Sequence, residues 1–75
     1  MPATLSKADQ EGIVTSHIKN VAFNAYNLEV SLIEENAKST PDAVAVANLG
    51  SQIASTTAQA AALEVELARV QALAE

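Results

Sequence analysis

The chain has 75 residues, no cysteine and one histidine, and its nine acidic and four basic residues give a formal net charge of −5. A domain this small usually needs disulfides, a metal ion or association with other chains to bury enough surface. The lack of cysteine excludes disulfides and zinc–thiolate sites, and one histidine forms no metal-binding cluster. The negative charge argues against binding to nucleic acid or an anionic membrane. Association with other chains is the route left, and we expect no cofactor.

The first helix is predicted to span about residues 6–37. Ser6 precedes Asp9 by three positions, the spacing of a capping box with aspartate in place of the usual glutamate. Apolar residues then recur at alternating steps of four and three, the a/d pattern of a coiled coil. These residues are Val14, Ile18, Val21, Ala25, Leu28 and Leu32. Residues 1–5 have neither a basic segment nor an apolar run, so we expect no signal peptide.

The helical pattern breaks at residues 37–42, where small polar residues accompany a proline. Thr40 suits an N-cap, Pro41 suits the first position of a helix, and Asp42 places negative charge in the first turn. Lys38 is a cation near the end of the preceding helix, where the helix dipole favours it. We therefore expect a turn at residues 38–40 and a second helix over about residues 41–74.

The second helix repeats the a/d alternation, and the short turn requires the two helices to run antiparallel. Its seam residues are Val46, Leu49, Ile53, Thr56, Ala60, Leu63, Leu67, Val70 and Ala74. The expected register places Leu32 near Leu49 and Val14 near Leu67, with a slip of three or four residues left open. No segment alternates as a half-buried strand does. The sequence predicts a single all-α domain, an antiparallel two-helix hairpin that packs into a larger helical assembly.

Residues 43–63 carry no formal charge, which raises the question of a membrane span. A span needs ~20 predominantly apolar residues. Polar side chains interrupt this segment at Asn48, Gln52, Ser55, Thr56, Thr57 and Gln59. We therefore expect a soluble, alanine-rich helix and no membrane span.

A second apolar pattern lies on the faces turned away from the seam. In the first helix it consists of Phe23, Tyr26, Val30 and Ile33, and in the second it includes Ala54, Ala58 and Ala61. Contiguous exposed apolar residues usually mark an interface, and small residues let helix axes approach closely. The alternative is that single exposed apolar residues are common and that alanine simply favours helix. We predict that these seven residues form a protein interface.

Other residues give weaker signals. Glu34 and Glu35 diverge by about 100° around a helix, so we interpret them as solvated charge near the turn rather than as an acid/base or metal site. His17 lacks the Glu-x-x-His context of a di-iron bundle. Gly50 in mid-helix costs roughly 1 kcal/mol relative to alanine, and indicates a close crossing, a bend or tolerated drift.

The run from Ile18 to Ala37, followed by Pro41 and an alanine-rich heptad helix, resembles small helical accessory proteins of tailed bacteriophage virions. That resemblance implies a structural protein located in the virion. Type III secretion needle subunits are also hairpins of this length with a Pro/Asp turn, but this chain lacks their more polar, aromatic-rich second helix. The small secreted Trp-x-Gly proteins are excluded because the chain has no tryptophan.

These patterns predict a non-enzymatic structural subunit whose partners are copies of itself or other structural proteins of a large assembly. The alternative is a small adaptor or regulatory module that binds one partner protein. No nucleophile-and-base arrangement or phosphate-binding loop is present in the sequence, so an enzyme is the least favoured class.

Overall fold

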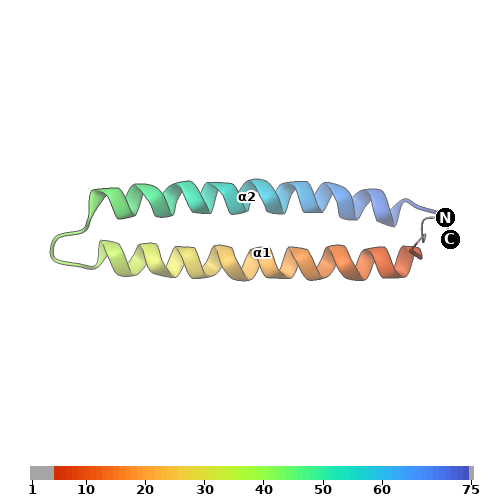
Figure 1. Cartoon of the computed structure of the whole chain (residues 1–75), viewed down its shortest axis with the longest axis horizontal. Helices are drawn as coiled ribbons and strands as arrows, with labels where there is room; N and C mark the ends of the chain where they lie inside the picture. The colour runs from red at the N-terminus through yellow and green to blue at the C-terminus, as the bar shows by residue number, and fades with distance from the viewer. Residues whose placement is uncertain (1–4, 75) are drawn as a thin grey trace.

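The computed structural model describes residues 5–74 and contains two α-helices, α1 (Lys7–Asn36) and α2 (Ala43–Gln71). The helices lie side by side and antiparallel, with the turn at one end and both ends of the described chain at the other (Figure 1). The molecule measures 57 × 22 × 14 Å, so it is one helix thick. Residues 5–74 contain no strand. The predicted all-α helical hairpin is confirmed.

The start of α1 agrees with the predicted cap at Ser6. Ser6 has an extended backbone (φ −64°, ψ 159°), and its hydroxyl oxygen accepts a hydrogen bond from the Asp9 amide at 3.1 Å. This bond satisfies one of the first amides of the helix, which have no partner within it. At the other end, the Ala37 amide donates to the Ile33 carbonyl at 3.1 Å and closes the last turn.

The start of α2 differs from the prediction. The N-cap is Asp42 rather than Thr40, and Pro41 lies in the turn rather than in the helix. The Asp42 carboxylate accepts hydrogen bonds from the amides of Val44 at 2.9 Å and Ala45 at 3.4 Å. Aspartate is at least as good an N-cap as threonine, so the first amides of α2 are capped at least as well as in the predicted arrangement. The connection between the helices therefore covers residues 37–42.

The end of α2 also falls short of the prediction. The helix stops at Gln71, and Ala74 is exposed, whereas Leu73 is half-buried. The expected register places Ala74 level with Lys7, the first residue of α1. Lys7 is charged, and the predicted seam residues are enclosed only as far as Val70.

The core is the seam between the helices. Every predicted seam residue from Val14 to Val70 is buried or half-buried, and the most enclosed are Val14, Thr56 and Val70. The hydroxyl of Thr56 donates to the Ile53 carbonyl at 2.8 Å, so its burial leaves no polar atom without a partner. A seam between only two helices covers one side of each, and the opposite sides remain available to other molecules.

Side chains from the two helices that share a surface groove support the expected register. Asn24 and Leu28 of α1 line this groove with Gln52, Ser55, Thr56 and Gln59 of α2. At the open end of the hairpin, an Arg69 guanidinium nitrogen lies 3.4 Å from the side-chain oxygen of Gln10. Both contacts place the helices within about two residues of the register that brings Leu28 beside Ile53.

Candidate protein-interaction surfaces

The outward face of α1 carries the residues that we call the α1 stripe: Phe23, Tyr26, Val30 and Ile33. Phe23 is 73% exposed, Tyr26 67% and Ile33 66%. Their alternating steps of three and four keep them on one side of the helix, and that side lies away from the seam. The structure thus brings three large, exposed apolar side chains together on one edge of the hairpin.

Val30 differs from its neighbours in the α1 stripe because it is half-buried. It is the shortest side chain of the four, and Tyr26 and Ile33 flank it one turn before and one turn after. Residues at this spacing are neighbours on a helix surface, and the position of Val30 faces away from the seam. Val30 therefore forms the floor of the α1 stripe.

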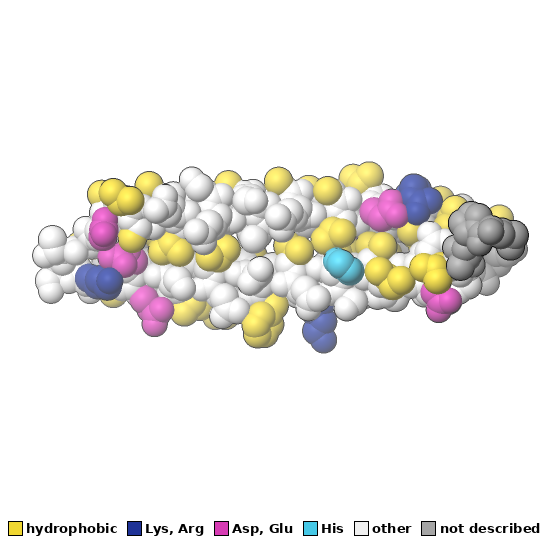
Figure 2. Space-filling model, viewed as in Figure 1, with side chains coloured by type: hydrophobic (Ala, Val, Ile, Leu, Met, Phe, Trp, Pro, Cys, Tyr) yellow, Lys and Arg dark blue, Asp and Glu magenta, His cyan; other side chains and the backbone are white. Residues whose placement is uncertain are grey.

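The outward face of α2 carries much smaller side chains. We call Ala47, Ser51, Ala54, Ala58 and Ala61 the α2 small face, and all five are exposed. Val44 and Val65 lie at its two ends and are 68% and 72% exposed. Figure 2 shows hydrophobic side chains recurring along the outer edge of α2 as well as along the boundary between the helices. The three alanines predicted as interface residues therefore lie on the edge opposite the α1 stripe.

Charged side chains gather toward the two ends of the hairpin in the view of Figure 2, with one basic side chain projecting from α1 between them. Near the open end, Arg69 forms an ion pair with Glu66 at 2.7 Å, within α2. The Arg69 guanidinium lowers the pKa of Glu66, and the Glu66 carboxylate raises the pKa of Arg69, in each case through their hydrogen bonds. An exposed pair of this kind contributes little to stability. The middle of both outward edges is left largely uncharged.

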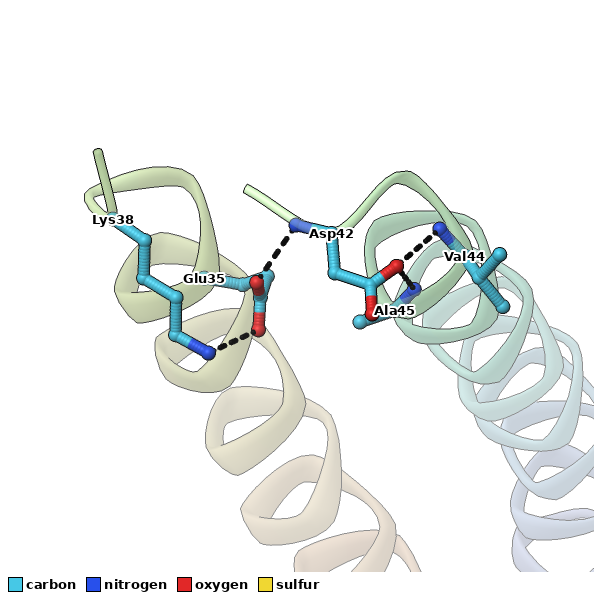
Figure 3. Close-up of polar contacts among 5 residues, drawn as sticks. All are labelled: Glu35, Lys38, Asp42, Val44 and Ala45. Atoms are coloured by element: carbon cyan, nitrogen blue, oxygen red, sulfur yellow. Dashed lines mark hydrogen bonds and ion pairs between the residues drawn. The ribbon is translucent and has the colours of Figure 1, made fainter. Parts of the chain in front are cut away.

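The turn contains a polar contact that the sequence interpretation missed. Figure 3 shows the Glu35 carboxylate between two donors, the Lys38 ammonium at 2.9 Å and the backbone amide of Asp42 at 3.0 Å. The Asp42 hydrogen bond, followed by the Lys38 hydrogen bond, lowers the pKa of Glu35. The same pairing raises the pKa of Lys38. Glu35 thus joins the end of α1 to the cap of α2.

The interpretation of Glu35 as solvated charge was therefore wrong, although Glu34 is exposed as expected. The two residues do diverge: the Glu35 side chain is only 12% exposed and faces the turn. A glutamate near the last turn of a helix that precedes a short connection was the available signal. That signal identifies the Glu35 contact only if Asp42, rather than Thr40, is known to be the N-cap of α2.

The residues considered for chemistry stay apart. Residues 5–74 hold no group of three histidine or acidic side chains that could bind a metal ion. His17 is exposed. No helix in this part of the chain combines the length and the apolarity needed to cross a bilayer. A side chain added at Gly50 would meet nothing within 4 Å, so the seam does not require glycine there.

Neither a protein-family model, nor a curated protein, nor a solved structure matches this chain.

Proposed function

We propose that this chain is a non-enzymatic structural subunit that packs into a larger protein assembly through the outward faces of its two helices. The observation that carries the proposal is the exposure of Phe23, Tyr26 and Ile33 on one edge, at 73%, 67% and 66%. Burying a side chain of this size stabilises a complex by roughly 1.5–3 kcal/mol. A contiguous exposed apolar patch is characteristic of an interaction site.

The geometry of the hairpin supports a packing role. The molecule is one helix thick, and its seam encloses few side chains, so it has little core of its own. Small domains of this kind often gain stability by association. The resemblance of the run from Ile18 to Ala37 to accessory virion proteins supports a tailed bacteriophage particle as the assembly. We propose the virion as the location on that basis.

An adaptor that binds one partner protein is the second candidate. The observation that favours it is the restriction of large exposed side chains in the middle of α1 to residues 23–33, a length that fits one groove on a partner. Helix-in-groove recognition uses anchors at this spacing. This candidate leaves the uncharged α2 small face without a role, which is why we place it second.

The double variant Phe23→Ser, Ile33→Ser tests the proposal, because both side chains are exposed and neither belongs to the seam. We expect the variant to remain helical by circular dichroism and to lose its oligomer, or its attachment to the parent assembly. Mass by light scattering and co-purification with the assembly measure this loss. The matched control, Asn20→Ser with Asn24→Ser, changes two exposed polar residues of α1 and should change neither property.

Two results would count against the proposal. Loss of helicity together with mass would place the α1 stripe in the hairpin core. Unchanged mass and unchanged attachment would mean that the exposed apolar side chains serve no interface. A small, stable complex with one partner would favour the adaptor.

A further inference from the structure

The α1 stripe and the α2 small face lie at the same height along the hairpin. The expected register, which the residues lining the shared groove support, places Leu32 level with Leu49 and Leu28 level with Ile53. Counting in opposite directions from these pairs places Phe23 level with Ala58 and Ile33 level with the neighbourhood of Ala47. The two faces are therefore on opposite edges of the molecule but span the same stretch of its length.

The two edges are also complementary in size. The α1 stripe projects two aromatic rings and an isoleucine, whereas the α2 small face presents four alanines and a serine. Large side chains on one helix pack closely only where the facing helix leaves room for them, and helix axes then approach to about 8–10 Å. A side-by-side copy of the hairpin, moved sideways without a shift along its length, brings these two surfaces together.

Charge does not oppose this contact locally. The α2 small face lies within residues 43–63, which carry no formal charge, and the α1 stripe contains no acidic or basic residue. Contact would therefore bury no unpaired charge, which is the costliest event in an interface. Each whole chain carries a net charge of −5, so copies repel one another at a distance. Salt screens such repulsion.

The area of one edge favours repeated copies over a single partner. A helix of 30 residues is about 45 Å long and about 10 Å wide, so one edge offers roughly 450 Å² per molecule. Stable one-to-one complexes bury about 800 Å² per partner. Each edge-to-edge contact is therefore smaller than a stable one-to-one interface, and a chain inside a row of copies is held by two such contacts, one on each edge.

We infer that the α1 stripe packs against the α2 small face of a second copy of this chain at the same height. The two copies point in the same direction, so α1 of one copy runs antiparallel to α2 of the other. This inference rests on the proposed function and names its partner. Such a contact uses different surfaces on the two copies, so each added copy leaves one free edge of each kind. Hairpins therefore add side by side into an open row or a closed ring.

Disulfide trapping in the full chain tests the arrangement, because the sequence contains no cysteine. Val30 and Ser51 lie near the centres of the two surfaces, and cysteine is close in size to both. We expect a mixture of Val30→Cys chains with Ser51→Cys chains to form mixed disulfide dimers on mild oxidation. Either variant alone should form several-fold fewer dimers. A chain with both substitutions should form a ladder of linked copies.

The matched control mixes Asn24→Cys chains with Gln59→Cys chains, whose side chains line the polar groove away from both edges. This control measures random collision and should give few dimers. Light scattering at increasing protein and salt concentration is the second measurement, and the mass should rise with both.

Three outcomes would overturn the inference. Efficient dimers of the Val30→Cys chain with itself would show that two α1 stripes meet in a symmetric pair. If mixed dimers form no more often than in the control, the two surfaces do not meet at the same height. A monomer at every concentration and salt would exclude a second copy. If the Phe23→Ser, Ile33→Ser variant still loses its assembly in any of these cases, the proposed function stands and only the partner is wrong.

Discussion

The Glu35 carboxylate accepts a hydrogen bond from the backbone amide of Asp42, seven residues further along the chain and at the start of the other helix. The oxygen–nitrogen distance is 3.0 Å. The other carboxylate oxygen accepts a hydrogen bond from the Lys38 ammonium. One side chain therefore joins α1, the turn and α2, and holds Asp42 in the extended conformation that lets it cap α2.

The first prediction concerns the pH dependence of this contact. Its hydrogen bonds hold the pKa of Glu35 below its ordinary value of 4.5, so the folded chain releases this proton more readily than the unfolded chain. The resulting stability is present above pH 4.5 and is lost as the pH falls through the lowered pKa. We expect Glu35→Gln to lower the melting temperature at pH 7, and the difference from the parent chain to shrink as the pH falls below 4.5.

Thermal melts by circular dichroism at several pH values measure this difference. Glu34→Gln is the control, because Glu34 is exposed and its charge is removed on the same helix. Equal effects of the two variants at pH 7 would mean that general charge, rather than the contact with Asp42, is responsible.

The second prediction separates the two possible caps of α2. Asp42→Ala removes the acceptor for the Val44 and Ala45 amides and should cost about 1 kcal/mol of stability. Thr40→Ala should cost much less, because Thr40 is exposed and lies in the turn. Urea unfolding of the two variants gives the comparison. A larger loss of stability for Thr40→Ala would indicate that Thr40, rather than Asp42, is the N-cap of α2.

The third prediction tests the seam. Leu28→Ala shortens a half-buried seam side chain, and we expect a loss near the lower end of the usual range, about 2 kcal/mol. Tyr26→Ala removes a larger but exposed side chain and should change the stability of the isolated hairpin less. Melting at low protein concentration keeps assembly from contributing. A larger loss of stability for Tyr26→Ala than for Leu28→Ala would mean that Tyr26, rather than Leu28, packs in the seam.

The fourth prediction concerns Gly50. An added methyl group meets nothing within 4 Å, and glycine in mid-helix is less favourable than alanine by about 0.8–1.0 kcal/mol. We expect Gly50→Ala to stabilise the hairpin by about that amount in urea unfolding. A destabilised variant would indicate a contact or bend at Gly50 that the hairpin itself does not require.

The sequence predicted the seam well because each helix repeats one pattern many times. A shift of one position in any layer would have exposed a whole row of apolar residues, so Val14 and Val70 could be assigned to the interior from spacing alone. The short turn then fixed the antiparallel arrangement. Repetition along the chain, rather than any single residue, made the fold predictable.

The turn was less predictable because several residues competed for the same role. Thr40 and Asp42 both suit an N-cap, and local preference does not rank them decisively. Glu35 lies outside the turn, seven residues before Asp42, and its hydrogen bond with the Asp42 amide is a contact that local cap preferences do not reveal. Exposure of the α1 stripe followed from its spacing, whereas the half-buried state of Val30 depends on the sizes of its neighbours.

Leu5 and Ala74 line the same hollow at the open end of the hairpin, and the turn lies at the far end. A force that pulled these two residues apart would act across the seam rather than along it. The helices would then separate one layer at a time, beginning at the contact between Gln10 and Arg69 and proceeding toward the turn. A load applied between the open end and the turn would instead run along the helix axes, where the backbone hydrogen bonds of the helices resist it. The hairpin is therefore mechanically weak in one direction and strong in the other.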